Sequence, residues 1–429
     1  MKDVFRIEGL EGGQALRGKV RVNGAKNAVL KSMAASILFE DELVLSNVPH
    51  IEDVERVAEL LSALGAKVGR NKNSYTIDTE GIGKPELDDA IARRLRASIV
   101  FSGPLLARFG RVSFPHPGGD VIGAGARPID LFLEGFQKMG CTVLTEGDRY
   151  HIVADDGRLR GAEIFFISVS VTATETLMMA ATLAKGTTFL RNAAMEPEIV
   201  ALAEFLNSCG ADIKGAGTPT IMIRGGGTLS SHGKVFETIP DRIETGSFLI
   251  LGALAGQEVE ITDCNPEHVA ILTGLLRESG VDIKTTPTTI VVRANGAKFK
   301  PLHIRTHEYP GFATDLQPPI VVYLTQAAGE STVFETIFGG RLSYTEDLVR
   351  MGADITLWNS RQITIKGPTP LVGKELESPD VRAGLAFVIA ATIAKGKSVI
   401  DNVYHIDRGY ERIEERLRSI GVPIERVGS

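Results

Sequence analysis

The chain has 429 residues, of which 43% are hydrophobic and 23% charged, a balance typical of a water-soluble globular protein with two or three domains. Its net charge of −6 is dispersed and leaves no basic stripe for a phosphate backbone, which argues against nucleic-acid binding. No apolar run is long enough to span a bilayer, and the start, MKDVFRIEGL, lacks the apolar core of a secretion signal, so we expect a cytoplasmic protein without membrane contact.

The residue types that bind metals or form disulfides are scattered along the chain. Cys141, Cys209 and Cys264 show no C-x-x-C spacing and stand among apolar residues, so we interpret them as small buried side chains. The eight histidines include no H-E-x-x-H pair. We therefore expect no metal site, and no motif indicates a cofactor.

One short pattern recurs six times at a period near seventy residues. The copies are LLSALGAKV (60–68), FQKMGCTV (136–143), FLNSCGADI (205–213), LLRESGVDI (275–283), LVRMGADI (348–355) and LRSIGVPI (417–424). Each copy predicts the end of an amphipathic helix, a glycine with positive φ just after it, and then a strand. The sequence thus predicts an α/β fold of six repeats.

A second, more apolar helix precedes most copies, as in LMMAATLA (177–184) and FVIAATIA (387–394). A helix that is apolar nearly all round must be buried, which a single repeat of this size cannot achieve. We therefore expect two domains of three repeats each, one formed by residues 1–22 and 237–429 and the other by residues 23–236. A small-molecule site in a cleft between them is the usual arrangement.

The first candidate binding segment is VNGAKNAVLKSMAASIL, where Gly24, Lys26 and Asn27 come just before a long buried helix. Glycine permits a close approach, and a helix N-terminus with a lysine favours a phosphate. A solvated lysine at a helix start is the competing interpretation, and this short pattern alone favours it.

The second segment is HPGGDVIGAGARPIDLF (116–132), a long glycine-rich stretch that interrupts the regular repeat. Such loops inside compact repeats are often functional. Arg127 and Asp130 flank Pro128 at the expected start of the next helix. The G-x-G-x-x-G spacing is absent, so we reject a dinucleotide-binding Rossmann fold.

The third segment, GFATDLQPP (311–319), places Asp315 between apolar neighbours and ahead of two prolines. A desolvated aspartate can act as a general base, but capping of the following helix is an equally good explanation. Arg341, Arg382 and Arg408 stand at turn-like positions, and arginine forks bind carboxylates and phosphates. Each alone is more often a surface charge, so a shared anion site depends on the fold.

These segments and the sixfold repeat together resemble the enolpyruvyl transferases over nearly the whole chain. The resemblance rests on NGAKNA, LRASIVFSGPLLARFG, GARPIDL, NAAMEPEIV, IPDRIETGSF, FATDLQ and YHIDRGYERIEERL. The EPSP synthase branch typically has a serine-lysine pair where this chain has Ala25, Lys26 and Asn27, which favours the branch that acts on UDP-N-acetylglucosamine. The resemblance implies a two-domain inside-out α/β barrel with three repeats in each domain.

The resemblance also implies phosphoenolpyruvate and UDP-N-acetylglucosamine as substrates, in the first committed step of peptidoglycan precursor synthesis. It assigns phosphoenolpyruvate to Lys26, Asn27, Arg127, Arg341, Arg382 and Arg408. Lys26, Arg127 and Arg408 are implied to hold its phosphate, and Arg341 and Arg382 its carboxylate. It assigns the nucleotide sugar to Arg96, Asn27, Arg127, Pro128, Ile129, Asp130, Leu131, Ser170, Val171, Asp315 and Ile337. Asp315 is implied as the base for the sugar 3-hydroxyl, and Lys26 and Arg408 as catalytic cations.

Three positions depart from the family pattern. Asp120 stands where many members carry a cysteine as proton donor, so we expect an aspartic acid in that role and resistance to epoxide inhibitors that alkylate the cysteine. Ser168 replaces a lysine near the diphosphate, and Phe132 replaces a histidine. Transfer to another acceptor, or a silent paralogue that binds a nucleotide sugar, therefore remain as alternatives.

Overall fold

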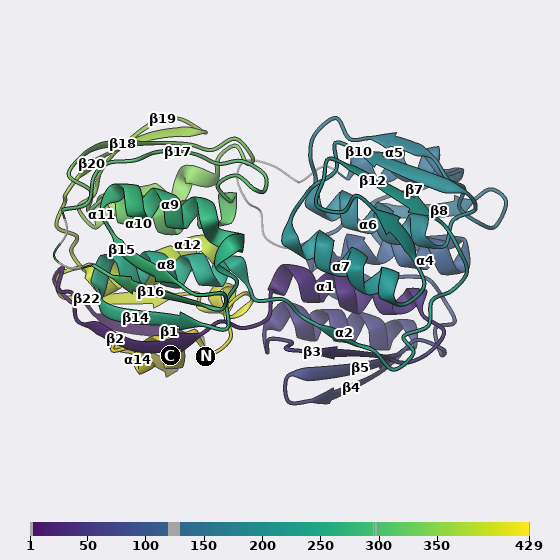
Figure 1. The fold of residues 1–429 in the computed structure, drawn as a ribbon, viewed down its shortest axis with the longest axis horizontal. Coiled ribbons are helices and arrows are strands. Elements are labelled where there is room, and N and C mark those ends of the chain that lie inside the picture. Colours follow the sequence, from purple (N-terminus) through teal and green to yellow (C-terminus); the bar gives the residue numbers. More distant parts are fainter. Residues whose placement is uncertain (1–2, 119–128, 295, 297, 429) are drawn as a thin grey trace. The chain divides into compact units, whose positions relative to one another are not determined.

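A computed structural model of the chain describes residues 3–118, 129–294, 296 and 298–428 (Figure 1). It divides into two compact units, which we call the C-terminal unit, with residues 1–23 and 240–429, and the inserted unit, with residues 24–118 and 129–239. Among the described residues the strands form six sheets of three or four strands. No described helix has the length and apolarity that a membrane crossing requires.

Three largely buried helices form the centre of the inserted unit, α1 (Lys26–Ala35), α4 (Ser102–Phe109) and α6 (Val171–Thr182). Each repeat adds a second helix, namely α2 (Glu52–Leu64), α5 (Asp130–Lys138) and α7 (Pro197–Ser208). Short helical segments are η1 (Ser36–Leu38), α3 (Asp89–Ala92) and η2 (Arg96–Phe101). Figure 1 shows these helices between the strands of the unit.

The three sheets of the inserted unit each combine strands that are distant in sequence. The first has the order β13 (Val235–Glu237), β3 (Leu43–Ser46), β5 (Ser74–Asp78) and β4 (Lys67–Asn71). The second has the order β6 (Arg111–Pro115), β8 (Arg149–Ala154) and β7 (Cys141–Glu146). The third has the order β11 (Asp212–Lys214), β12 (Thr220–Arg224), β10 (Thr187–Arg191) and β9 (Glu163–Phe165). Strand β13 pairs parallel with β3 and so joins the end of the unit to its first repeat.

The C-terminal unit repeats this plan with the central helices α8 (Arg242–Ala255), α10 (Gln317–Leu324) and α12 (Val381–Ile393). The second helices are α9 (Ala270–Ser279), α11 (Thr345–Arg350) and α14 (Ile413–Ser419), and α13 (Tyr404–Asp407) precedes the last of them. Three 3-10 segments complete the helical part, η3 (Pro266–Val269), η4 (Thr314–Leu316) and η5 (Arg341–Tyr344).

Three four-stranded sheets surround these helices. The first has the order β15 (Asp282–Thr285), β16 (Thr289–Arg293), β14 (Gly256–Thr262) and β2 (Leu16–Arg21). The second has the order β17 (His303–Arg305), β18 (Gly329–Phe334), β20 (Gln362–Gly367) and β19 (Asp354–Asn359). The third has the order β21 (Glu375–Glu377), β22 (Lys397–Asp401), β1 (Asp3–Glu8) and β23 (Ile424–Gly428). Strand β1 is antiparallel to both β22 and β23. The start of the chain thereby completes the sheet of the last repeat.

The glycine of each repeat adopts the predicted conformation. Their φ angles are all positive, at Gly65 (107°), Gly140 (84°), Gly210 (108°), Gly280 (107°), Gly352 (110°) and Gly421 (100°). The next strand begins one to three residues later in every repeat, at β4, β7, β11, β15, β19 and β23. The predicted change from helix to strand at each copy is confirmed.

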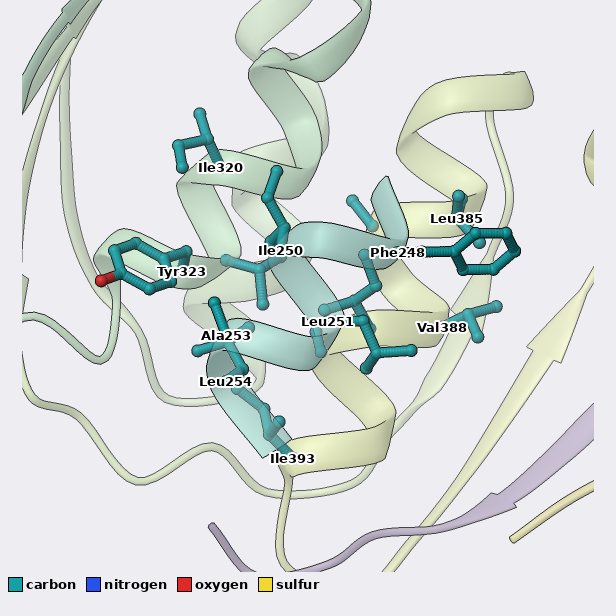
Figure 2. Packing of buried hydrophobic residues seen from close by; sticks show 14 of the residues in the cluster. Phe248, Ile250, Leu251, Ala253, Leu254, Ile320, Tyr323, Leu385, Val388 and Ile393 are labelled. Carbon is teal, nitrogen blue, oxygen red and sulfur yellow. The ribbon is translucent and has the colours of Figure 1, made fainter. Parts of the chain in front are cut away.

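The core of the C-terminal unit lies where α8, α10 and α12 meet (Figure 2). Phe248 and Leu251 of α8 pack near Leu385 and Val388 of α12, and Ile320 belongs to the same cluster. Every residue of α10 and α12 is buried, which confirms the burial predicted from FVIAATIA in α12. Burying one such large apolar side chain contributes about 1.5–3 kcal/mol, so this core fixes the helix starts that carry the polar residues described next.

Candidate functional site

Two arginines of the C-terminal unit bind the carboxylate of Asp315. Arg341 Nη2 donates to Asp315 Oδ1 at 3.0 Å, and Arg382 Nε donates to Asp315 Oδ2 at 3.0 Å. The side chains of Arg341 and Arg382 are 1% and 6% exposed, whereas that of Asp315 is 23% exposed. We call these three residues the arginine clasp. The arginine clasp thus consists of two buried arginines and one partly exposed aspartate.

Three different elements position the arginine clasp. Asp315 lies in η4, immediately before α10. Arg341 begins η5 after Gly340, whose φ of 80° turns the chain. Arg382 is in the first turn of α12, where the N-cap Asp380 accepts hydrogen bonds from the backbone N–H groups of Arg382 (2.7 Å) and Ala383 (3.0 Å). Arg341 and Arg382, which were expected at turn-like positions, therefore lie in a 3-10 segment and in the first turn of a helix, respectively.

The geometry excludes one of the two interpretations of Asp315, the capping of α10. Its two carboxylate oxygens are engaged by the arginines, and the N-cap of α10 is Leu316, which makes no side-chain capping bond within the described chain. Asp315 therefore does not cap α10.

A second layer of polar groups orients the arginines. Thr314 Oγ1 accepts from Arg341 Nη1 at 2.8 Å and donates to Glu335 Oε2 at 2.8 Å. Glu335 is fully buried, and its Oε1 accepts from the backbone N–H of Ile337 at 2.9 Å. Ile337, which was predicted to contact the nucleotide sugar, therefore lies beside Glu335. Arg341 Nε is buried and has no hydrogen-bond partner among the described residues.

Arg382 also contacts the segment that follows α13. Its Nη1 donates to the hydroxyl of Tyr410 at 2.9 Å, and its guanidinium lies 5.4 Å from the Tyr410 ring centre. Burial opposes the charge, but Tyr410, Asp315 and Asp241 outweigh burial and raise the pKa of Arg382. Arg408 precedes this tyrosine by two residues and is 5% exposed, so it is a buried cation rather than a surface charge.

Lys26 and Asn27 begin α1 in the inserted unit, as the sequence predicts. Lys26 Nζ lies 2.6 Å from Asp53 Oδ2, and the two side chains are only 12% and 5% exposed. The interpretation of Lys26 as a solvated helix-start lysine is therefore wrong. The close approach at Gly24 is to the chain itself, because a Cβ there would lie 1.8 Å from the backbone oxygen of Asn47.

The remaining predicted residues of the inserted unit lie at the starts of helical segments. Arg96 begins η2 and its Nη1 donates to the Pro117 carbonyl at 3.2 Å. Ser170 caps α6 by accepting from Ala173 N at 3.2 Å, and Val171 begins that helix. Ile129 is buried, Asp130 begins α5 with an exposed side chain, and Leu131 is half-buried. Asp120, Arg127 and Pro128 lie outside the described residues.

The two substituted positions differ in their surroundings. Phe132 is 4% exposed and belongs to the hydrophobic core of the inserted unit. Ser168 is exposed, two residues before the cap of α6. The three cysteines are buried, as predicted. Sequence reasoning missed Thr314, Glu335 and Tyr410, although Thr314 lies in FATDLQ and Tyr410 in YHIDRGYERIEERL, because these segments assigned no role to either side chain.

Comparison with known proteins defines the class of the chain. The family described as EPSP synthase (3-phosphoshikimate 1-carboxyvinyltransferase) matches residues 10–417. The crystal structure of the enolpyruvyl transferase NikO from Streptomyces tendae has a similar fold, with a TM-score of 0.88 and 23% identity, over 100% of this chain and 99% of that one. EPSP synthase from Acinetobacter baumannii aligns with a TM-score of 0.74 and 19% identity, over 99% and 100% of the two chains. The predicted enolpyruvyl transferase fold is confirmed.

Sequence relatives narrow this class further. A UDP-N-acetylglucosamine 1-carboxyvinyltransferase of Acidobacterium capsulatum is 44% identical over 98% of this chain and 96% of its own length. The enzyme of the same name from Serratia proteamaculans is 43% identical over 99% of both chains. The chain therefore belongs to the EPSP synthase family of enolpyruvyl transferases and, within it, to the group of the UDP-N-acetylglucosamine 1-carboxyvinyltransferases.

Proposed function

We propose that this chain transfers the enolpyruvyl group of phosphoenolpyruvate to the 3-hydroxyl of UDP-N-acetylglucosamine and releases phosphate. Relatives of that name, 43% and 44% identical over almost the whole chain, support the reaction and its acceptor. The observation that carries the proposal is the buried arginine clasp around Asp315, because it joins anion-binding groups to a candidate base. The reaction belongs to cytoplasmic peptidoglycan precursor synthesis.

Phosphoenolpyruvate carries a carboxylate and a phosphate, and the cationic residues suit both groups. Arg341 and Arg382 bind the carboxylate, with the unpartnered Nε of Arg341 as a donor that Asp315 does not use. Lys26, Asn27, Arg127 and Arg408 bind the phosphate side of the substrate. Arginine and lysine stabilise the phosphate dianion as it leaves.

The reaction proceeds by addition and elimination. Asp120 donates a proton to the methylene carbon of phosphoenolpyruvate, which makes the adjacent carbon electrophilic. Asp315 accepts the proton of the sugar 3-hydroxyl while its oxygen attacks that carbon and forms a tetrahedral intermediate. The Asp120 carboxylate then takes a proton back from the methyl group, and departure of phosphate restores the double bond. Arg96, Ile129, Asp130, Leu131, Ser170, Val171 and Ile337 bind the nucleotide sugar.

Replacement of Asp315 by Asn tests this assignment. The amide keeps the shape of the side chain but cannot accept the hydroxyl proton, so acceptor-dependent phosphate release should fall by about 10²–10⁴-fold. Binding of UDP-N-acetylglucosamine, measured by calorimetry, should persist. Turnover equal to that of the unsubstituted enzyme would remove Asp315 as the base.

A second candidate is transfer to a different hydroxylated acceptor. The exposed Ser168 and the buried Phe132 favour it, because they stand where the family resemblance implies a lysine and a histidine at the nucleotide. Phosphate release with other nucleotide sugars, but none with UDP-N-acetylglucosamine, would establish this alternative. The absence of phosphate release with any acceptor tested would indicate a silent paralogue that only binds nucleotide sugars.

A further inference from the structure

A buried ion pair joins two central helices of the inserted unit. Lys31 of α1 and Glu175 of α6 are 7% and 0% exposed, and Lys31 Nζ lies 3.2 Å from Glu175 Oε2. The same ammonium donates to the backbone carbonyl of Asn27 at 2.6 Å. One buried cation therefore connects α6 to the first turn of α1, which carries the candidate phosphate-binding residues.

Stability alone does not account for this pair. Two charges removed from water usually gain no more from each other than two well-packed apolar side chains would supply. The surroundings increase this cost, because Glu196 and Glu198 at the start of α7 are 4% and 3% exposed and carry the same sign as Glu175. Neither carboxylate oxygen of Glu175 has a hydrogen-bond partner in the part of the chain that the structure describes, so its contact with Lys31 is an ion pair alone. The pair therefore needs an explanation other than net stabilisation.

The charge of Glu175 is sensitive to pH near neutrality. Its pKa is raised to about 7, because burial and the carboxylates of Glu198 and Glu196 raise it by more than Lys31 lowers it. These three are the charged groups that dominate its surroundings, from α1 and from the start of α7. Protonation of Glu175 removes the ionic part of its contact with Lys31 and leaves only the bond to Asn27.

We propose that Lys31 and Glu175 are positioning residues that hold the first turn of α1 in a fixed position relative to the start of α6. The first turn of α1 carries Lys26 and Asn27, and the start of α6 carries Ser170 and Val171. The proposal rests on the proposed function, since it assigns a purpose to the turns that bind the phosphate and the nucleotide sugar. The ionised pair fixes these two helix starts together. Its loss loosens substrate positioning without removing any group that touches a substrate.

The decisive comparison is between Lys31→Met and the double substitution Lys31→Met with Glu175→Leu. The single variant buries an uncompensated carboxylate and should lower the melting temperature, whereas the double variant should recover it. Substrate positioning should not recover, because the bond from the Lys31 ammonium to the Asn27 carbonyl is absent in both variants. We expect kcat/KM for phosphoenolpyruvate to stay about fivefold to tenfold low in both. Recovery of kcat/KM together with stability would overturn the proposal.

A readout independent of catalysis separates this inference from the proposed function. Amide hydrogen exchange at residues 28–31 should be faster in both variants, while exchange in α8 of the C-terminal unit stays unchanged. Unaltered exchange at residues 28–31 in the double variant would refute the positioning role even if the unsubstituted enzyme turned out to be inactive. Absence of acceptor-dependent turnover in the unsubstituted enzyme would refute the proposed function alone.

Glu175→Gln provides a third variant that keeps the shape of the side chain. The amide resembles the protonated acid, so the variant keeps the unionised contact at every pH. The kcat/KM of the unsubstituted enzyme divided by that of the variant should therefore rise by about fivefold to tenfold as the pH increases through neutrality and Glu175 ionises. The ratio removes the titration of groups that both proteins share. A ratio that stays constant from pH 5.5 to about pH 8.5 would contradict the proposal.

Discussion

Each oxygen of the Asp315 carboxylate accepts a hydrogen bond from a different buried arginine, and the proposed function rests on this feature at the residue scale. A buried guanidinium that binds through two edges cannot be replaced by an ammonium, which offers a point charge without the fork. Arg382 uses Nε for Asp315 and Nη1 for Tyr410. The substitution that tests the clasp is therefore a conservative one.

Replacement of Arg382 by Lys should lower kcat/KM for phosphoenolpyruvate by about 10²-fold to 10³-fold, because the charge remains while the two directed bonds are lost. Steady-state kinetics with phosphoenolpyruvate as the varied substrate measure the effect. Arg350→Lys in the same unit is the matched control, since Arg350 is 60% exposed and pairs with Asp347 at the surface. Equal kinetics in the two variants would exclude Arg382 from the site.

The identity of the loop residue Asp120 leads to a chemical prediction. A carboxylic acid does not form the stable thioether by which fosfomycin inactivates a cysteine, so incubation with fosfomycin should cause no time-dependent loss of activity. Asp120→Cys should introduce that sensitivity while it retains turnover. Intact-mass analysis of both proteins detects the adduct, and a covalent adduct on the unsubstituted loop would contradict the assignment.

At the scale of elements, the start of α1 depends on a contact that only glycine allows. A Cβ at Gly24 would lie 1.8 Å from the Asn47 backbone oxygen, so Gly24→Ala must displace the chain before α1. We expect a loss of about 2–4 kcal/mol in the free energy of unfolding, measured by denaturant titration. Gly83→Ala is the control, because a Cβ there meets nothing within 4 Å.

The contact between α1 and α6 predicts a dependence of stability on pH. The folded pKa of Glu175, about 7, lies above its ordinary value of 4.5, so the folded state binds the proton more tightly. Its contribution to stability is therefore greatest below about pH 4.5, declines as the pH rises to about 7, and is constant above that. Denaturant titrations of the unsubstituted protein and of Glu175→Gln should show this decline in their difference. A difference that does not change with pH would contradict it.

At the scale of the whole molecule, the sequence predicted the architecture better than the site. Six glycines at a regular spacing predicted the six helix ends, and the apolar helices predicted which helices are buried. These features are local, so periodicity reveals them. The resemblance to the enolpyruvyl transferases supplied the fold, which the structural comparisons confirm.

Side-chain pairing was beyond the sequence because it depends on contacts between distant segments. Asp315 meets Arg341 and Arg382 from 26 and 67 residues away, and although the resemblance assigns all three to substrates, no local pattern indicates that they pair directly with one another. The pairing of Lys26 with Asp53 was missed for the same reason. The residue roles themselves stay predictions, and measurements on the enzyme must test them.

The most direct test of the central claim is a phosphorus NMR time course with phosphoenolpyruvate and UDP-N-acetylglucosamine. We expect inorganic phosphate to appear in a one-to-one ratio with a new UDP-sugar species that carries the enolpyruvyl group, and no phosphate release when the UDP-sugar is omitted. Phosphate release without a new UDP-sugar species, or an unchanged spectrum under the same conditions, would contradict the assignment.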